Sequence, residues 1–145
     1  MNSSGTVGDG TTTQRNAPVT IDGSSTYQSV SVSAFNTCAV TVSGVLKCWG
    51  QNTRGQIGNN TTSIVYSPTA IDIGVQYRYV SIGERLACAI TSTDALKCWG
   101  TNTLGTLGNG LYDVNVGSKV PIVVDPGTSY KYVAIEGDTH VVGVT

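Results

Sequence analysis

The pentapeptide LKCWG occurs twice in this chain, at Leu46–Gly50 and at Leu96–Gly100, and the two copies lie fifty residues apart. Together they contain both tryptophans of the 145-residue sequence and two of its four cysteines. A phrase that returns at a fixed interval of about 20 to 50 residues is typical of proteins built from repeated structural units. We therefore expect the remainder of the unit on either side of the pentapeptide.

The match extends well beyond the five letters. Residues 37–60 (TCAVTVSGVLKCWGQNTRGQIGNN) and 87–110 (ACAITSTDALKCWGTNTLGTLGNG) are identical at 13 of 24 positions. YQSVSV before the first copy aligns with YRYVSI before the second, and MNSSGTVGDG at the start resembles the text that follows LKCWG. The chain therefore reads as a single domain made of repeats, with units at about 1–26 (partial), 27–76, 77–129 and 130–145 (partial).

The composition favours strands over helices. Gly, Thr, Ser and Val dominate, and no stretch of a dozen residues shows the apolar period of a helix. Each unit divides into four short runs, which in the first full unit lie at about 29–33, 37–42, 45–49 and 69–73, with Gly, Asn, Ser and Pro between them. Four strands in a repeat of about 40 to 50 residues predict a propeller blade. The predicted fold class is all-β, with about three four-stranded antiparallel blades.

These motifs resemble a known family. The order of CAhT, hKCWGxNxxGxhGxG (h is apolar) and then a proline-led strand is similar to the regulator of chromosome condensation repeat, and especially to its cysteine-bearing bacterial form. The resemblance covers almost the whole chain. It implies β-propeller blades in a family whose complete propellers have about seven, so we expect a partial propeller or one completed by oligomerisation. It also implies a non-catalytic module that presents loops to a protein partner.

The four cysteines are predicted to form two disulfides. In CAVTVSGVLKC, counting inward from Cys38 and Cys48 places the turn of a hairpin at Ser43, so the two cysteines oppose each other across antiparallel strands, within disulfide reach. The same count pairs Cys88 with Cys98. Zinc is the alternative, but structural zinc sites favour cysteines two to four residues apart. Disulfides favour an extracellular or cell-surface location, and the resemblance implies a bacterial protein. Because residues 1–10 lack a signal-peptide pattern, we expect Met1 to begin an excised segment.

The charge pattern excludes several classes of function. The net charge is −1 and only 12% of residues are charged, which gives no basis for binding nucleic acid or an anionic membrane, and no apolar run is long enough for membrane insertion. The acidic residues are scattered, and three of them recur at one repeat position, which indicates turn structure: Asp22, Asp72 and Asp125. The single histidine, His140, has no evident nucleophile partner. We predict no catalytic, cofactor-binding or metal-binding residues.

Two loops differ most between the repeats, at 61–66 and 111–119. They hold the candidate partner-binding residues Tyr66, Tyr112, Asp113 and Asn115, although both loops can equally be passive connectors. Within LKCWG, we expect Leu and Trp to pack between blades and Lys to face solvent.

The third unit lacks a counterpart of VSGVLKCWG, and Val141 or Val142 stands where the other units have Cys38 and Cys88. Either further polypeptide supplies the strand, or an open strand edge pairs with another chain. Self-association, head to tail or by ring closure, is therefore expected. The alternative to a binding module is a structural repeat protein that stacks into a surface layer or fibre.

Overall fold

The computed structural model describes residues 2–111, 117–137 and 140–145. Its strands form three antiparallel sheets, which confirms the all-β prediction. The first sheet has the order β1 (Tyr27–Val32), β2 (Asn36–Thr41), β3 (Leu46–Gly50) and β4 (Val65–Ala70). The second has the order β5 (Tyr77–Ile82), β6 (Leu86–Thr91), β7 (Leu96–Gly100) and β8 (Ser118–Val123). The third pairs β9 (Tyr132–Glu136) with β10 (His140–Val144), and a single 3-10 turn, η1, spans Thr103–Gly105.

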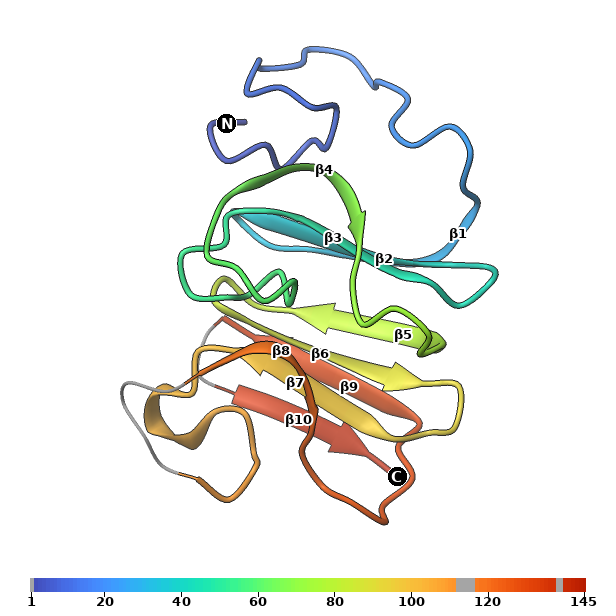
Figure 1. Cartoon of the computed structure of the whole chain (residues 1–145), viewed down its shortest axis with the longest axis vertical. Coiled ribbons are helices and arrows are strands. Elements are labelled where there is room, and N and C mark those ends of the chain that lie inside the picture. Colours follow the sequence, from blue (N-terminus) through green and yellow to red (C-terminus); the bar gives the residue numbers. More distant parts are fainter. Residues whose placement is uncertain (1, 112–116, 138–139) are drawn as a thin grey trace.

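The sheets stack on one another in chain order (Figure 1). The first strand of each sheet lies against the first two strands of the sheet before it, since β5 contacts β1 and β2, and β9 contacts β5 and β6. Each four-stranded sheet is a simple up-and-down meander, in which every strand pairs with its sequence neighbour. This arrangement is that of consecutive blades in a propeller, and the chain forms part of one.

The predicted position of the fourth strand is wrong. We expected it at 69–73 behind a leading proline, but β4 begins at Val65 and ends at Ala70, so that Pro68 lies inside it. A proline has no N–H to donate to a β-ladder, which confines it to edge strands. Because β4 has only β3 as a neighbour, Pro68 is tolerated there, and Pro121 occupies the same kind of edge position in β8.

The core lies between the sheets rather than within one of them. One cluster joins Leu46 and Cys48 of the first sheet to Val80, Ile82 and Trp99 of the second. A second cluster joins Leu86, Leu96 and Cys98 to Val133, with Ile135 packed against it. All six residues of β6 are buried, because its sheet is covered on both faces.

Candidate functional site

Two disulfides fasten the central hairpins. Cys38 lies directly opposite Cys48 in the β2–β3 register, and Cys88 lies opposite Cys98 in the β6–β7 register. Their S–S distances are 2.13 and 2.11 Å, and their Cα atoms are 4.1 and 4.0 Å apart. This is the pairing expected from the hairpin count, and all four cysteines are buried.

The lysine of LKCWG does not face solvent, contrary to the prediction. The Lys47 ammonium donates to Asp22 at 2.6 Å, and the Tyr27 hydroxyl donates to the same carboxylate oxygen. The second unit repeats this cluster, with Lys97 2.7 Å from Asp72 and Tyr77 donating to the same oxygen.

Each aspartate lies just before the first strand of a sheet, and each lysine lies on the third strand of that sheet. We call this group the Lys–Asp–Tyr cluster. The aspartates do form turns, as predicted. They also bind the lysines that we expected to face solvent. The signal that reveals the cluster is the fixed separation of 25 residues between Asp22 and Lys47 and again between Asp72 and Lys97.

The electrostatics of the cluster follow from these contacts. The hydrogen bond from Lys47, followed by the one from Tyr27, holds the pKa of Asp22 well below its usual range. Burial, together with the carboxylate of Asp72, raises the pKa of Tyr77 above its usual range. Burial and the carboxylate of Asp22 raise the pKa of Tyr27 in the same way. Asp22 is therefore ionised and Tyr27 neutral at any physiological pH, so the cluster is a structural ion pair and not a proton shuttle.

A third Asp–Tyr pair completes the series. The Tyr130 hydroxyl donates to the Asp125 carboxylate at 2.6 Å, with the same spacing of five residues as in the first two units. Hydrogen bonds from Tyr130 and Thr128 lower the pKa of Asp125. Asp22 and Asp72 have positive φ, but Asp125 does not, since Pro126 follows it and the residue before a proline favours extended backbone.

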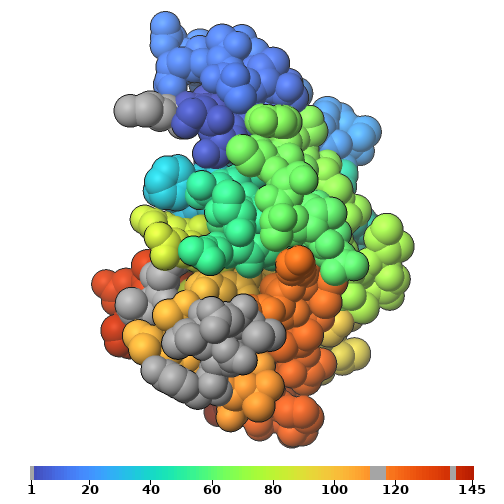
Figure 2. All heavy atoms as spheres, turned by 60° about the vertical axis from the view of Figure 1, so that its left-hand side comes forward, coloured from blue at the N-terminus to red at the C-terminus, as the bar shows by residue number. Residues whose placement is uncertain are grey.

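Three buried asparagines organise equivalent loops of the repeat. Asn52 and Asn102 lie in the loops that follow the two LKCWG strands, and Asn2 lies in the matching loop at the N-terminus. Asn52 accepts a hydrogen bond from the Ile57 backbone N–H at 3.0 Å and donates to the Thr61 carbonyl at 3.0 Å. Asn102 makes the corresponding bonds to Leu107 and Leu111 at 3.0 and 3.1 Å, and Asn2 does so to Val7 and Thr11. Figure 2 shows these loops one above another, in blue, green and orange. We call this side of the molecule the loop face.

The tryptophans fasten each loop to the next unit. The Trp99 indole N–H donates to the Gln56 carbonyl at 2.9 Å, and the ring lies against Gly58, where a side chain would collide with it. Trp49 makes the same contacts with the Thr6 carbonyl and Gly8. Glycine is required at these positions because the backbone has positive φ and the indole occupies the space of a Cβ.

The structure describes only part of the predicted partner-binding set. Tyr112, Asp113 and Asn115 lie outside the described residues. Tyr66 is the second residue of β4, where its carbonyl accepts a hydrogen bond from Gly10 and its side chain packs over Gly5. Tyr66 thus serves a contact within the chain while remaining 40% exposed.

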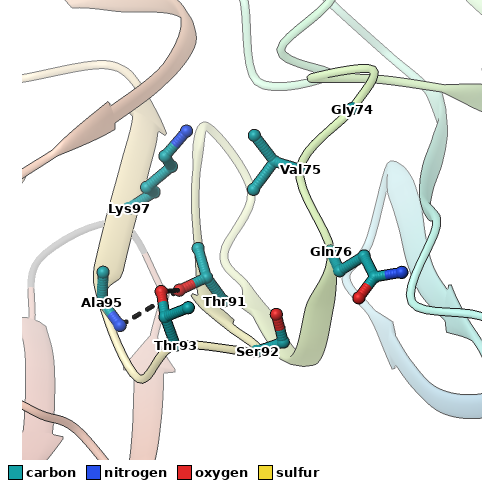
Figure 3. A pocket seen from close by; sticks show the side chains of 8 residues that line it. All are labelled: Gly74, Val75, Gln76, Thr91, Ser92, Thr93, Ala95 and Lys97. Atoms are coloured by element: carbon teal, nitrogen blue, oxygen red, sulfur yellow. Dashed lines mark hydrogen bonds between the residues drawn. The ribbon is translucent and has the colours of Figure 1, made fainter.

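A shallow groove of about 400 Å³ lies at the opposite side, between the Gly74–Gln76 segment and the hairpin turn before β7 (Figure 3). The Thr91 hydroxyl bonds to the Thr93 hydroxyl at 3.0 Å and accepts from the Ala95 N–H at 3.1 Å, so these hydroxyls serve the turn. Among the described residues that line the groove, Lys97 is the only ionisable one, and its ammonium is engaged by Asp72. The groove therefore offers neutral polar surface and no group positioned for acid–base chemistry.

No group of three or more His, Cys, Asp and Glu side chains in residues 2–111, 117–137 and 140–145 is arranged to hold a metal ion. Within those same ranges, no helix has the length and apolar character needed to cross a membrane.

Comparison with known proteins agrees with this geometry. Residues 27–56 match the model of the regulator of chromosome condensation (RCC1) repeat. No curated protein matches the chain significantly in sequence.

Several solved structures share the fold at low sequence identity. Human WBSCR16 superposes with a TM-score of 0.78 at 21% identity, over 94% of this chain and 37% of its own length. Prp20p from Saccharomyces cerevisiae, described with its binding to Gsp1p and histones, superposes with a TM-score of 0.84 at 15% identity, over 99% and 38%. The ectodomain of the Physcomitrella patens receptor kinase CR4 superposes with a TM-score of 0.54 at 20% identity, over 89% and 29%.

The stacked four-stranded sheets define the molecule as a segment of a β-propeller. Residues 27–56 match the RCC1 repeat, and the same sequence pattern recurs fifty residues later. The chain spans less than two fifths of the length of the structures to which it is similar.

Proposed function

We propose that this chain is a non-catalytic, extracellular protein-interaction module that presents the loops of its propeller repeats to a protein partner. The observation that carries the proposal is the exposure of large apolar side chains on the loop face. Leu111 is 65% exposed, while Ile64 and Tyr66 are exposed by more than a third. Apolar side chains held in water on rigid loops are typical of interaction sites.

The backbone beneath Leu111 is held by hydrogen bonds. The Leu111 backbone carbonyl accepts a hydrogen bond from the side chain of the buried Asn102. The same side chain accepts a hydrogen bond from the Leu107 backbone N–H in the loop. A backbone segment held in this way loses less conformational entropy on binding than a free one, which favours affinity. Prp20p, which shares the fold and binds Gsp1p and histones, is consistent with a protein partner for this chain.

Two observations support an extracellular location. All four cysteines of the chain form disulfides, and disulfides persist in oxidising compartments. A receptor ectodomain also shares the fold.

A non-catalytic role is supported by the carboxylates of the repeats. The carboxylates of Asp22 and Asp72 are each held by an ion pair with a lysine and a hydrogen bond from a tyrosine, so neither is available as a general base or acid.

The test is affinity capture from the secreted and surface proteins of the source organism, comparing the wild-type chain with Leu111→Ser. Ile73→Ser is the matched control, because Ile73 is 90% exposed but lies in the turn after β4, at the far end of that strand from the loop face. A partner retained by the control and lost by Leu111→Ser is the expected result. Equal capture by both variants, or no captured protein at all, contradicts the proposal.

A second candidate function is a structural array, and one observation favours it. Val30 and Val32 of β1 are each 63% exposed, whereas their counterparts Val80 and Ile82 in β5 are buried against the preceding sheet. The opposite end of the stack exposes Tyr132 of β9. These two ends correspond to the two sides of the contact between sheets, so copies of the chain can stack head to tail.

Light scattering separates the two candidates. The array predicts masses that are multiples of 15.0 kDa and that rise with concentration, and loss of the multiples in Val30→Asp. A single monomer mass at micromolar concentration excludes the array and leaves the interaction module, because a stacked array requires the chains to associate at that concentration.

A further inference from the structure

The third sheet has an open strand edge at a defined register. In the pairing of β9 with β10, Val142 lies opposite Ala134, which repeats the pairing of Cys38 with Ser31 and of Cys88 with Ser81. This register settles which valine takes the place of the cysteine. It also shows that β10 is the counterpart of β2 and β6. Those strands pair on their other side with β3 and β7, the LKCWG strands, whereas β10 has only β9 as a neighbour in the described chain.

The Lys–Asp–Tyr cluster of this unit lacks its lysine. Asp125 and Tyr130 keep the hydrogen bond of the first two clusters, but in the described part of the chain no basic side chain forms an ion pair with Asp125. The lowered pKa of Asp125 keeps this carboxylate charged at neutral pH. An ammonium group is the partner that the same geometry holds at Asp22 and Asp72.

The tryptophan position of the unit is open as well. Gly8 and Gly58 are each covered by the indole of an LKCWG strand, at distances that leave no room for a Cβ. Gly108, which stands at the same place in the third loop, has nothing within 4 Å of that position. The carbonyls that accept from Trp49 and Trp99 belong to the residues two before these glycines, so the corresponding acceptor is the carbonyl of Thr106.

Both open positions line the same groove, of about 350 Å³. Its walls come from the loop after β7 through Thr106 and Gly108, from the Asp125–Tyr130 pair, and from the edge of β10 through Val141 and Gly143. In the occupied units the lysine and the tryptophan are two residues apart on one strand, so their side chains point to the same face. One strand is therefore sufficient to fill both positions.

We propose that this groove binds an extended strand of sequence Leu-Lys-x-Trp-Gly, the third strand of an RCC1-type repeat, as an addition to β10. Transferring the β2–β3 register places its Trp opposite Val141, its Lys opposite Gly143 and its Gly opposite His140. The ammonium pairs with Asp125, the indole covers Gly108, and the strand backbone completes the ladder of β10.

The strand must come from a repeat other than the two complete ones in this chain. Lys47 and Lys97 are already held by Asp22 and Asp72, and both LKCWG strands pair on both edges. A second folded copy therefore cannot offer either strand without unfolding. This proposal does not rest on the loop-binding function, because the groove uses β10 and the Asp125–Tyr130 pair rather than Ile64, Tyr66 or Leu111.

The register can be tested by disulfide trapping. The probe is a synthetic peptide with the sequence of residues 44–51, GVLKCWGQ, whose cysteine should lie opposite residue 142, as Cys48 lies opposite Cys38. Full-length chain carrying Val142→Cys is incubated with the peptide in a glutathione redox buffer, and the adduct is measured by mass spectrometry. Val144→Cys is the matched control, since Val142 and Val144 are 59% and 51% exposed and lie on the same face of β10.

The proposal predicts at least about ten-fold more adduct with Val142→Cys than with Val144→Cys, because only an opposed pair of Cα atoms comes within disulfide reach. Equal trapping of the two variants, or no adduct with Val142→Cys, overturns it.

The contribution of the peptide's lysine is tested separately, with unlabelled protein that keeps its native cysteines. A fluorescein-labelled form of the peptide with its cysteine replaced by serine is titrated by anisotropy, and replacement of its lysine by methionine should weaken binding by about ten-fold or more, as expected for a hydrogen bond to a charged group. Asp125→Asn should cause a similar loss, whereas Asp22→Asn, the same change in an occupied cluster, should not. Binding that ignores the lysine contradicts the proposed site even where Asp125→Asn fails to fold, since the peptide change leaves the protein untouched.

Discussion

Trp99→Phe tests how one unit is fastened to the next. The substitution keeps an aromatic ring on β7 and removes the indole N–H that donates to the Gln56 carbonyl at 2.9 Å. Both residues are buried, with exposures of 0% for Trp99 and 1% for Gln56. No water is therefore at hand to replace the lost donor.

The size of the effect follows from two contributions. A buried carbonyl left without a donor costs about 1–3 kcal/mol. The smaller ring also leaves space beside Gly58 and Ile71, and a cavity of a few carbon atoms adds about 1 kcal/mol. We expect the free energy of unfolding to fall by roughly 2–4 kcal/mol in total.

Urea unfolding followed by circular dichroism measures this change as a shift of the midpoint by about 1–2 M. Trp49→Phe is the matched control, because Trp49 makes the same bond to the Thr6 carbonyl, in an N-terminal segment that contains no strand. That variant should mainly expose the segment to trypsin at Arg15, with a smaller shift of the midpoint. The reasoning is refuted if Trp99→Phe unfolds within 0.5 kcal/mol of wild type, a difference of the size expected for a neutral surface substitution, or if Trp49→Phe shifts the midpoint more.

Three further predictions concern stability. Replacing Cys88 and Cys98 by serine should lower the unfolding free energy by about 2.7 kcal/mol, the chain-entropy value for a loop of this length, as calorimetry will show. Stability should decline as the pH falls below about 4, because the pKa of Asp22 is lower in the folded chain than the unfolded value of 3.8. It should also decline as the pH rises above about 10, because folding raises the pKa of Tyr77 above 10.0. Urea midpoints that stay constant across both pH ranges argue against the clusters. Ser81→Ala removes the hydroxyl that accepts from the Ile135 N–H at 3.1 Å and should cost about 1 kcal/mol, with faster hydrogen exchange at Ile135 as the specific readout.

The repeat and its hairpins could be predicted from the sequence because their determinants are local. Cys38 and Cys48 are ten residues apart on two strands joined by a short turn, so counting along the chain gives their register. The asparagine of each loop bonds to backbone five to nine residues away, which again lies within one continuous stretch.

The contacts between segments that are distant in sequence could not be predicted in the same way. Lys47 was expected to face solvent because its strand neighbours do not reveal Asp22, which lies on a different element 25 residues earlier. The strand β4 was placed too late because Pro68 was interpreted as a boundary, whereas an edge strand has no ladder bond on its open side for a proline to break. Both errors concern the arrangement of segments within one sheet, which counting along a single hairpin does not supply.

The central claim is that the chain contains two occupied Lys–Trp sites and one open site of the same construction. The most direct measurement is a backbone amide NMR titration of the full chain with the GVLKSWGQ peptide. The account predicts that the largest shift changes occur at Gly108, Thr128 and Gly143, around the groove, and that the peptide with methionine in place of lysine leaves them small. Shift changes centred on the hairpin turn at Thr91–Ala95, or spread evenly over the chain, contradict the claim.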